Sequence, residues 1–405
     1  MKWIDRLQSR FVNVPLIAYG LAATSFINRM GGTAKLFMAL YLHESLGFDL
    51  STVGVLLSIY GAGLLAGSFV VSVLTDWFSA RKLMLWSLVG SAIGLLILCG
   101  VTATVPLALA LLFGGLCDGG YRPSMQRVMM QNCAPSVRVH AQALQRVAVN
   151  LGFAMGGLVG GWFAEFDYRY VFLADAITAV GAAIFLRWAL RRADELTTDS
   201  FVPVIPVAQR WPYFDGPFMT FMLACLMLSI IYAQSESTMT NYLREYYALS
   251  PKWIGACFAL NGFMVAVLQI PITVRTEYWP PRRTMMAGAA ILTFGFAILP
   301  IGAGFAETAS IAMALLSTAV YTVGEMLLMP PQLAMVMLRA DAGRAGHYLA
   351  IYNGIWGGRT MIAPLLGNTV YDLFGGHAVW FMCAVLGLVA LMLQFHAIRQ
   401  IQADA

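Results

Sequence analysis

The sequence predicts an all-α membrane protein of twelve transmembrane helices, arranged as two six-helix bundles related by pseudo-symmetry. Three observations predict this class. Of the 405 residues, 60% are hydrophobic and only 11% are charged, whereas a soluble domain carries roughly 25% charged residues. Apolar runs long enough to cross about 30 Å of hydrocarbon recur along the chain. The loops between these runs alternate in positive charge, which is the pattern of a polytopic helical protein.

The apolar runs place the helices in order at about 12–42, 52–75, 83–104, 106–131, 140–164, 170–190, 217–243, 252–274, 284–303, 308–337, 346–371 and 377–398. The first run follows a basic start and is too long for a signal peptide. Loops on the side of both termini hold sixteen basic residues, against Arg169, Arg244 and Lys252 on the other side. Because cytoplasmic loops carry the excess of Lys and Arg, both termini are predicted to be cytoplasmic.

One connection is longer and more polar than the rest. Residues 191–216 read RRADELTTDSFVPVIPVAQRWPYFDG, a charged and proline-containing stretch. We interpret it as a cytoplasmic linker between an N-terminal bundle, 1–190, and a C-terminal bundle, 217–405. The halves echo each other weakly. Asp118 and Pro123 in the fourth helix match Glu325 and Pro330 in the tenth, 207 residues later.

Several function classes fit the sequence poorly. The six cysteines are scattered and show no metal-ligand spacing, so neither a metal site nor a disulfide framework is expected. An enzyme of lipid or glycan chemistry would need a larger extramembrane loop or a cluster of catalytic groups, so we expect no catalytic residues. The net charge of +5 comes from membrane-flanking loops and requires no nucleic-acid partner. The expected partners are the lipid bilayer, a small-molecule substrate and protons.

Two motifs resemble a known family. The loop SVLTDWFSARKLMLW (72–86) is similar to the G-x-L-x-D-R-x-G-R-[RK] loop motif of the major facilitator superfamily. The run NLGFAMGGLVGG (150–161) resembles its antiporter motif G-x-x-x-G-P-x-x-G-G, with Gly157 in place of the proline. The stretches GGYRPSMQ (119–126), LQRVAVNLG (144–152) and 242–271 are similar to one branch of the twelve-helix drug/proton antiporters. The resemblance covers nearly the whole chain.

The resemblance implies a bacterial inner-membrane, multi-pass transporter that works as a monomer, with no cofactor other than a proton gradient. Two groups of residues are candidates for gating. Asp76 at a helix end can hold Arg81 and Lys82 and form a latch, although a solvated loop charge remains an alternative. The small-residue face allows a neighbouring helix to approach closely, which fits either gating or ordinary packing; its residues are Gly152, Gly156, Gly160 and Gly161.

Charged residues lie well inside several apolar helices, where each costs roughly 2.5–3.5 kcal/mol on insertion scales. Their signs nearly balance, so we expect them to surround a watery interior cavity; they are Asp118, Glu236, Glu325, Arg29, Lys35, Arg122 and Arg359. Asp118 and Arg122 share a helix face and could instead form a structural pair. Glu325 and Glu236 have no basic residue one turn away on their own helix, and burial favours the neutral form of a carboxylic acid. We therefore interpret Glu325, Glu236 and Asp118 as candidate proton carriers.

Aromatic and methionine side chains also lie well inside the apolar helices, and such side chains suit varied amphipathic ligands. Besides the three arginines, the candidate cavity residues are Tyr121, Tyr232, Tyr321, Tyr352, Trp356, Met125 and Met326. These residues could equally fill contacts between helices. The sequence favours a secondary active transporter with alternating access that exports small amphipathic molecules or drugs by proton antiport. Because Arg29, Arg122 and Arg359 would suit an anion, a proton-coupled symporter or exchanger of an anionic metabolite, siderophore or peptide stays open.

Overall fold

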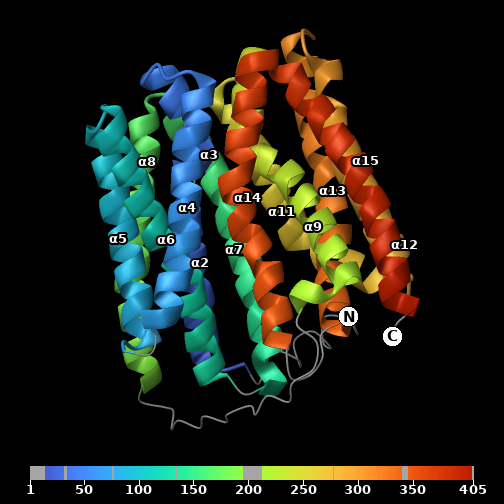
Figure 1. The fold of residues 1–405 in the computed structure, drawn as a ribbon. Helices are drawn as coiled ribbons and strands as arrows, with labels where there is room; N and C mark the ends of the chain where they lie inside the picture. The colour runs from blue at the N-terminus through green and yellow to red at the C-terminus, as the bar shows by residue number, and fades with distance from the viewer. Residues whose placement is uncertain are drawn as a thin grey trace, which may run out of the picture. The chain divides into compact units, whose positions relative to one another are not determined.

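The computed structural model describes residues 14–31, 34–74, 77–133, 135–194, 212–276, 278–339 and 345–403. Within these ranges nearly every residue is helical and no strand occurs (Figure 1). The contacts between residues divide the chain into two compact units. The N-terminal unit comprises Met1–Ala34 and Gly63–Val202, and the C-terminal unit comprises Lys35–Ala62 and Pro203–Ala405.

The N-terminal unit is a bundle with an apolar interior. It contains α2 (Leu16–Gly31), the second half of α4 (Leu50–Leu74), α5 (Ala80–Gly100), α6 (Thr104–Asn132), α7 (Pro135–Ala164) and α8 (Tyr168–Asp194). α5 packs against α6, while α2 packs against α7 and α8. Buried side chains from several of these helices form one core, including Leu21, Leu88, Val128 and Leu186.

The C-terminal unit is built from α3 (Ala34–Leu40), the π-helical turn η1 (Tyr41–Ser45), the first half of α4, η2 (Pro212–Phe214), α9 (Gly216–Ser237), α10 (Met239–Glu245), α11 (Pro251–Thr276), α12 (Pro281–Ala297), η3 (Leu299–Gly302), α13 (Glu307–Arg339), α14 (Ala345–Phe374) and α15 (Gly376–Ala403). α12 packs against α13 and α15, and α9 packs against α14 and α15. These contacts position the residues of the site described below.

The twelve expected helices correspond to helical segments of the structure, with ends shifted by a few residues. The first, expected at 12–42, is α2 followed by α3 and η1, and residues 32–33 between them lie outside the described residues. The seventh continues as α9 and α10. Ten of the described helices are long and apolar enough to cross a bilayer.

The segment Lys35–Ala62 packs within the C-terminal unit. A Cβ added to Gly61 would overlap the carbonyl oxygen of Thr360, so the backbones of α4 and α14 are in direct contact. Nearby, the Ser58 hydroxyl donates a hydrogen bond of 2.6 Å to the carbonyl oxygen of Met361. These contacts fix the segment that carries Lys35 against helices from the second half of the sequence. The division of the chain at 191–216 stays a prediction, and residues 195–211 of that linker lie outside the described residues.

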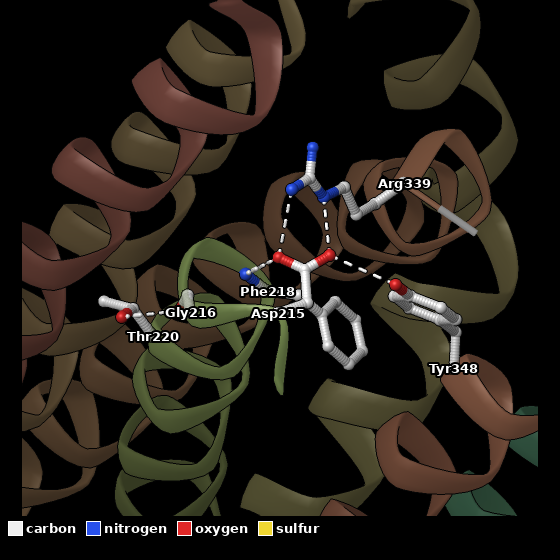
Figure 2. A network of polar contacts seen from close by, with 6 residues as sticks. All are labelled: Asp215, Gly216, Phe218, Thr220, Arg339 and Tyr348. Carbon is white, nitrogen blue, oxygen red and sulfur yellow. Dashed lines mark hydrogen bonds and ion pairs between the residues drawn. The ribbon is translucent and has the colours of Figure 1, made fainter. Parts of the chain in front are cut away.

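A buried carboxylate joins the ends of three helices of the C-terminal unit (Figure 2). Asp215 caps α9, where its Oδ1 accepts a hydrogen bond from the backbone N–H of Phe218. Arg339, in the last turn of α13, donates from Nε to Oδ2 at 2.7 Å and from Nη2 to Oδ1 at 3.0 Å. The Tyr348 hydroxyl, at the start of α14, donates to Oδ2 at 3.1 Å. This Asp215 clamp holds together the helices that form most of the cavity wall.

The charge of the clamp is stabilised by its donors. Burial by itself raises the pKa of Asp215, but the hydrogen bonds from Arg339 and Phe218 outweigh it and hold the pKa below its ordinary value. A bidentate pairing between a guanidinium and a carboxylate is among the strongest polar contacts in proteins. The clamp is therefore a fixed structural ion pair.

Replacing Asp215 with Asn is expected to lower the free energy of unfolding by about 2–3 kcal/mol, because Arg339 loses its charged partner inside the protein. The matched control is Asp49→Asn, since Asp49 caps α4 through Thr52 in an exposed position and its loss should cost less. Thermal unfolding of both purified variants checks this. Because the pKa of Asp215 is lowered, its contribution is present above the ordinary value of 3.8 and is lost as the pH falls below it. Equal destabilisation by the two variants would contradict the role of the clamp.

Candidate functional site

A cavity lies within the C-terminal unit, between α9, α12, α13 and α14. Its wall is mainly apolar and aromatic, with a few polar groups. The apolar and aromatic side chains are Leu228, Tyr232, Leu292, Leu328, Met329, Tyr352, Ile355 and Trp356, and the others are Cys225, Ser229, Glu325 and Gln332. A mainly apolar wall with a few polar groups is typical of small-molecule sites.

The charged group on the cavity wall is the carboxylate of Glu325. This side chain is only 7% exposed. The Asn261 side chain of α11 donates from Nδ2 to Oε2 of Glu325 at 3.2 Å. The same Nδ2 also lies 2.9 Å from the Thr322 hydroxyl, which donates to the carbonyl oxygen of Thr318. A neutral amide thus orients the carboxylate toward the cavity.

A second group of charges comes from three separate helices and is called the Glu236 cluster below. Lys35 of α3 places Nζ 3.6 Å from Oε2 of Glu236 in α9. Arg359 of α14 places Nη2 3.8 Å from Oε1 of the same carboxylate. Both distances are those of ion pairs and are too long for hydrogen bonds. The sequence interpretation considered neighbours along one helix only, so it did not pair Glu236 with Lys35 or Arg359.

Arg359 connects the Glu236 cluster to the cavity. Its guanidinium carbon lies 4.4 Å from the centroid of the Trp356 ring and 5.1 Å from that of Tyr232. Both rings line the cavity. Such cation–π contacts hold a guanidinium against an aromatic face. The position of two wall side chains therefore depends on the arginine of the cluster.

The structure divides the predicted cavity residues of the C-terminal unit into two sets. Glu325, Tyr232, Tyr352 and Trp356 line the cavity. Tyr321 and Met326 are each 1% exposed and lie behind the wall. Tyr321 stacks on Phe296 with ring centroids 4.6 Å apart, so it supports the wall without lining the cavity.

The remaining predicted residues belong to the N-terminal unit. Tyr121 is buried in the core, where its hydroxyl pairs with the Ser25 hydroxyl at 2.8 Å. Met125 belongs to the same core. Arg29 and Asp118 are half-buried, and Arg122 is exposed on α6. A role for Asp118, Arg29 and Arg122 in binding or proton transfer stays a prediction.

The predicted gating residues also lie in the N-terminal unit. Asp76 is outside the described residues. Arg81 donates from Nη2 to the side-chain oxygen of Asn132, at the end of α6, at 3.2 Å, and Lys82 is exposed. A Cβ added to Gly152 would lie 2.7 Å from the carbonyl oxygen of Phe26, so α7 and α2 approach closely at this glycine. The other three glycines of the face are buried on α7; they are Gly156, Gly160 and Gly161.

Sequence reasoning missed the neutral polar residues of the site. Asn261, Ser229 and Gln332 stand in apolar helices, where an uncharged amide or hydroxyl gives a weak signal. A search for amides within transmembrane runs would have found Asn261 and Gln332. No such search would have paired Asn261 with Glu325, because the pairing depends on tertiary packing.

Comparisons with known proteins agree with this architecture. A model of the Major Facilitator Superfamily matches residues 21–359 and, in a second match, residues 225–401. The MFS-type transporter YhjO of Bacillus subtilis (strain 168) is 23% identical over 398 residues, covering 98% of this chain and 96% of the relative. The multidrug resistance protein MdtH of Klebsiella pneumoniae (strain 342) is 24% identical over 363 residues, covering 86% of each chain.

A solved structure extends the comparison to three dimensions. The crystal structure of a mutant of the nucleoside transporter NupG has a TM-score of 0.78 to this chain at 15% identity, covering 94% of this chain and 99% of that one. At this identity the likeness concerns the fold. It confirms the prediction of a twelve-helix transporter fold in two six-helix bundles.

The cavity predicts a difference in thiol accessibility. In two single-cysteine proteins, one retaining Cys225 and one retaining Cys383, a small methanethiosulfonate reagent should modify Cys225 at least about tenfold faster. Both thiols are buried, at 3% and 0% exposure, but Cys225 lines the cavity whereas Cys383 of α15 does not. The modification rate is followed by mass spectrometry, and detergent-denatured samples serve as a control in which both thiols should react. Equal rates in the folded proteins would contradict the assignment of the cavity.

Proposed function

The chain belongs to the major facilitator superfamily of transporters, and we propose that it exports small amphipathic molecules across the bacterial inner membrane in exchange for protons. The observation that carries this proposal is the Glu325 carboxylate on the wall of an apolar cavity formed by membrane-spanning helices. The name of the relative MdtH, a multidrug resistance protein, supports export. Both termini are proposed to face the cytoplasm, and the driving force is the proton gradient.

Glu325 is the better candidate for the proton site because it is more deeply buried than Glu236 and lies on the cavity wall. Glu236 lies between two cations, Lys35 and Arg359, which favour its ionised form. The side-chain amide of Asn261 donates a hydrogen bond to Glu325. A titratable group on the wall of an apolar cavity is a candidate for proton transfer.

The proposed cycle uses this property. When the protein faces outward, Glu325 takes up a proton, and its neutralisation removes the cost of enclosing a charge in an apolar site. The protein then opens inward, the substrate enters the cavity, and the proton is released to the cytoplasm. Since substrate and proton compete for one cavity, each outward transfer of substrate is coupled to inward transfer of a proton. In this proposal the glycine face of α7 and the Asp76 loop serve as moving contacts, and the protein acts as a monomer.

A second candidate is proton-coupled symport or exchange of an anionic metabolite, siderophore or peptide. The observation that favours it is the excess of positive charge around Glu236, where Lys35 and Arg359 face one carboxylate. The two candidates differ in direction. In proteoliposomes with an imposed pH gradient, antiport moves substrate toward the acidic compartment, whereas symport moves it toward the alkaline one.

Replacing Glu325 with Gln is expected to abolish proton-driven accumulation of substrate in proteoliposomes, because the neutral amide cannot bind and release a proton. Exchange of substrate down its own gradient should persist, since the cavity keeps its shape. The matched control is Glu307→Gln, which removes an exposed carboxylate from the first turn of the same helix and should leave accumulation unchanged. The measurement follows uptake of labelled substrates from a drug panel together with a pH-sensitive dye.

Full retention of gradient-driven accumulation by Glu325→Gln would refute Glu325 as the proton site. Loss of accumulation in Glu236→Gln alone, with Glu325→Gln active, would move the proton site to the Glu236 cluster.

A further inference from the structure

Arg359 is buried with unused hydrogen-bonding capacity. The residue is 7% exposed, and its Nε and Nη1 atoms are buried with no hydrogen-bond partner among the described residues. Its Nη2 lies 3.8 Å from Glu236, at ion-pair distance but beyond a hydrogen bond. A guanidinium carries five N–H donors, and leaving buried donors unpaired is costly. An unpaired buried group of this kind calls for a partner such as a water, an ion or a bound molecule.

The same unit shows how this chain pairs an arginine when the role is structural. In the Asp215 clamp, Arg339 forms two short hydrogen bonds to one carboxylate, at 2.7 and 3.0 Å. Arg359, by contrast, has Nη2 3.8 Å from Oε1 of Glu236, and its Nε and Nη1 atoms have no hydrogen-bond partner among the described residues. The guanidinium of Arg359 therefore makes fewer hydrogen bonds than that of Arg339.

Arg359 is nevertheless held in a defined position. Its guanidinium lies against the rings of Trp356 and Tyr232, at 4.4 and 5.1 Å from their centroids. Contacts with aromatic faces fix the plane of a guanidinium but consume none of its N–H donors, which lie in that plane. Both rings are part of the cavity wall, so the guanidinium of Arg359 lies directly behind that wall.

The charges around Arg359 favour an anion. Lys35 and Arg359 place two cationic side chains against the carboxylate of Glu236, and Arg359 is the more deeply buried of the two. An anionic group on a bound molecule would give the Nε and Nη1 donors of Arg359 the acceptors that they lack.

We propose that Arg359 binds an anionic group of the transported molecule, so that the substrates are amphipathic molecules carrying a carboxylate or a comparable oxyanion. The inference rests on the proposed transport through this cavity and narrows its substrate class. The apolar part of such a molecule fits against Leu228, Leu328 and Ile355. Any cationic group on the same molecule can face Glu325, so the proposal holds for export and for uptake.

The test is a binding measurement with two probes that differ in one charge. Dansylglycine has an apolar fluorescent body and a carboxylate, and its methyl ester lacks the negative charge. Fluorescence titration of the full-length protein in nanodiscs should show dansylglycine binding at least about tenfold more tightly than the ester, as expected for charge-assisted hydrogen bonds. In Arg359→Gln this preference should disappear, with the affinity for the ester changed less than about twofold.

Two further variants make the result specific. Arg359→Lys keeps the charge but loses the planar fork, so it should restore part of the preference. Arg244→Gln removes an exposed arginine of the same unit that pairs with Glu44 and should keep the full preference. Thermal unfolding of every variant establishes that the folded protein is compared.

Three outcomes would overturn the inference. One is a carboxylate preference that survives in folded Arg359→Gln. Another is equal loss of both probes in Arg359→Gln and Arg359→Lys, which would give the arginine a structural role. The third is a preference present in gluconate buffer and absent in chloride, because Arg359 would then hold a free inorganic anion. These results concern binding, so they are independent of the proton-coupling assay on Glu325, whose failure would overturn the proposed transport mechanism instead.

Discussion

A side chain that carries charge into hydrocarbon must find its partners inside the protein, because lipid offers none. The C-terminal unit meets this constraint in two different ways. At the start of α9 the charge of Asp215 is fully paired with Arg339, Tyr348 and a backbone N–H. Near the other end of α9 the carboxylate of Glu236 meets Lys35 and Arg359 at the longer distances of 3.6 and 3.8 Å. The first arrangement stabilises the fold, and the second leaves polar capacity beside a cavity.

The cavity and the Glu236 cluster are joined by aromatic side chains. Tyr232 belongs to α9, one turn before Glu236, and Trp356 belongs to α14, one turn before Arg359. A change in the pairing of Arg359 therefore reaches the cavity wall directly through the two rings that it contacts. Lys35 connects Glu236 to α3, a short helix from the first part of the sequence.

Most of the helical framework could be predicted from the sequence, because the thickness of the bilayer sets the length of each apolar run. Several cavity residues could also be predicted, because they stand near the middle of their apolar runs; these are Glu325, Tyr232, Tyr352 and Trp356. The face of a helix was harder to predict. Tyr321 and Met326 stand in the same helix as Glu325 but are buried in packing contacts. Because the hydropathy of such a helix is high on every side, it does not indicate which face lines a cavity.

Contacts between side chains far apart in the chain could not be predicted from the sequence. Lys35, Glu236 and Arg359 come from α3, α9 and α14, and their meeting depends on how these helices pack. The assignment of Lys35–Ala62 to the C-terminal unit has the same origin, because it rests on contacts such as that of Gly61 with Thr360. Arg339 is a comparable case. Its position in a basic loop indicated only membrane orientation, while its role in pairing with Asp215 required the fold.

The Asp215 clamp has a consequence for the mechanics of the cavity wall. It ties α9, α13 and α14 at one end, and Glu236 lies about 30 Å farther along α9, given the rise of an α-helix. Beyond the cavity, α9 and α14 are joined again, where the side-chain amide of Gln234 donates a hydrogen bond of 3.1 Å to the carbonyl oxygen of Ala363. The stretches of α9 and α14 that line the cavity thus lie between two fixed contacts, which limits the length of the molecule that the chamber can accept.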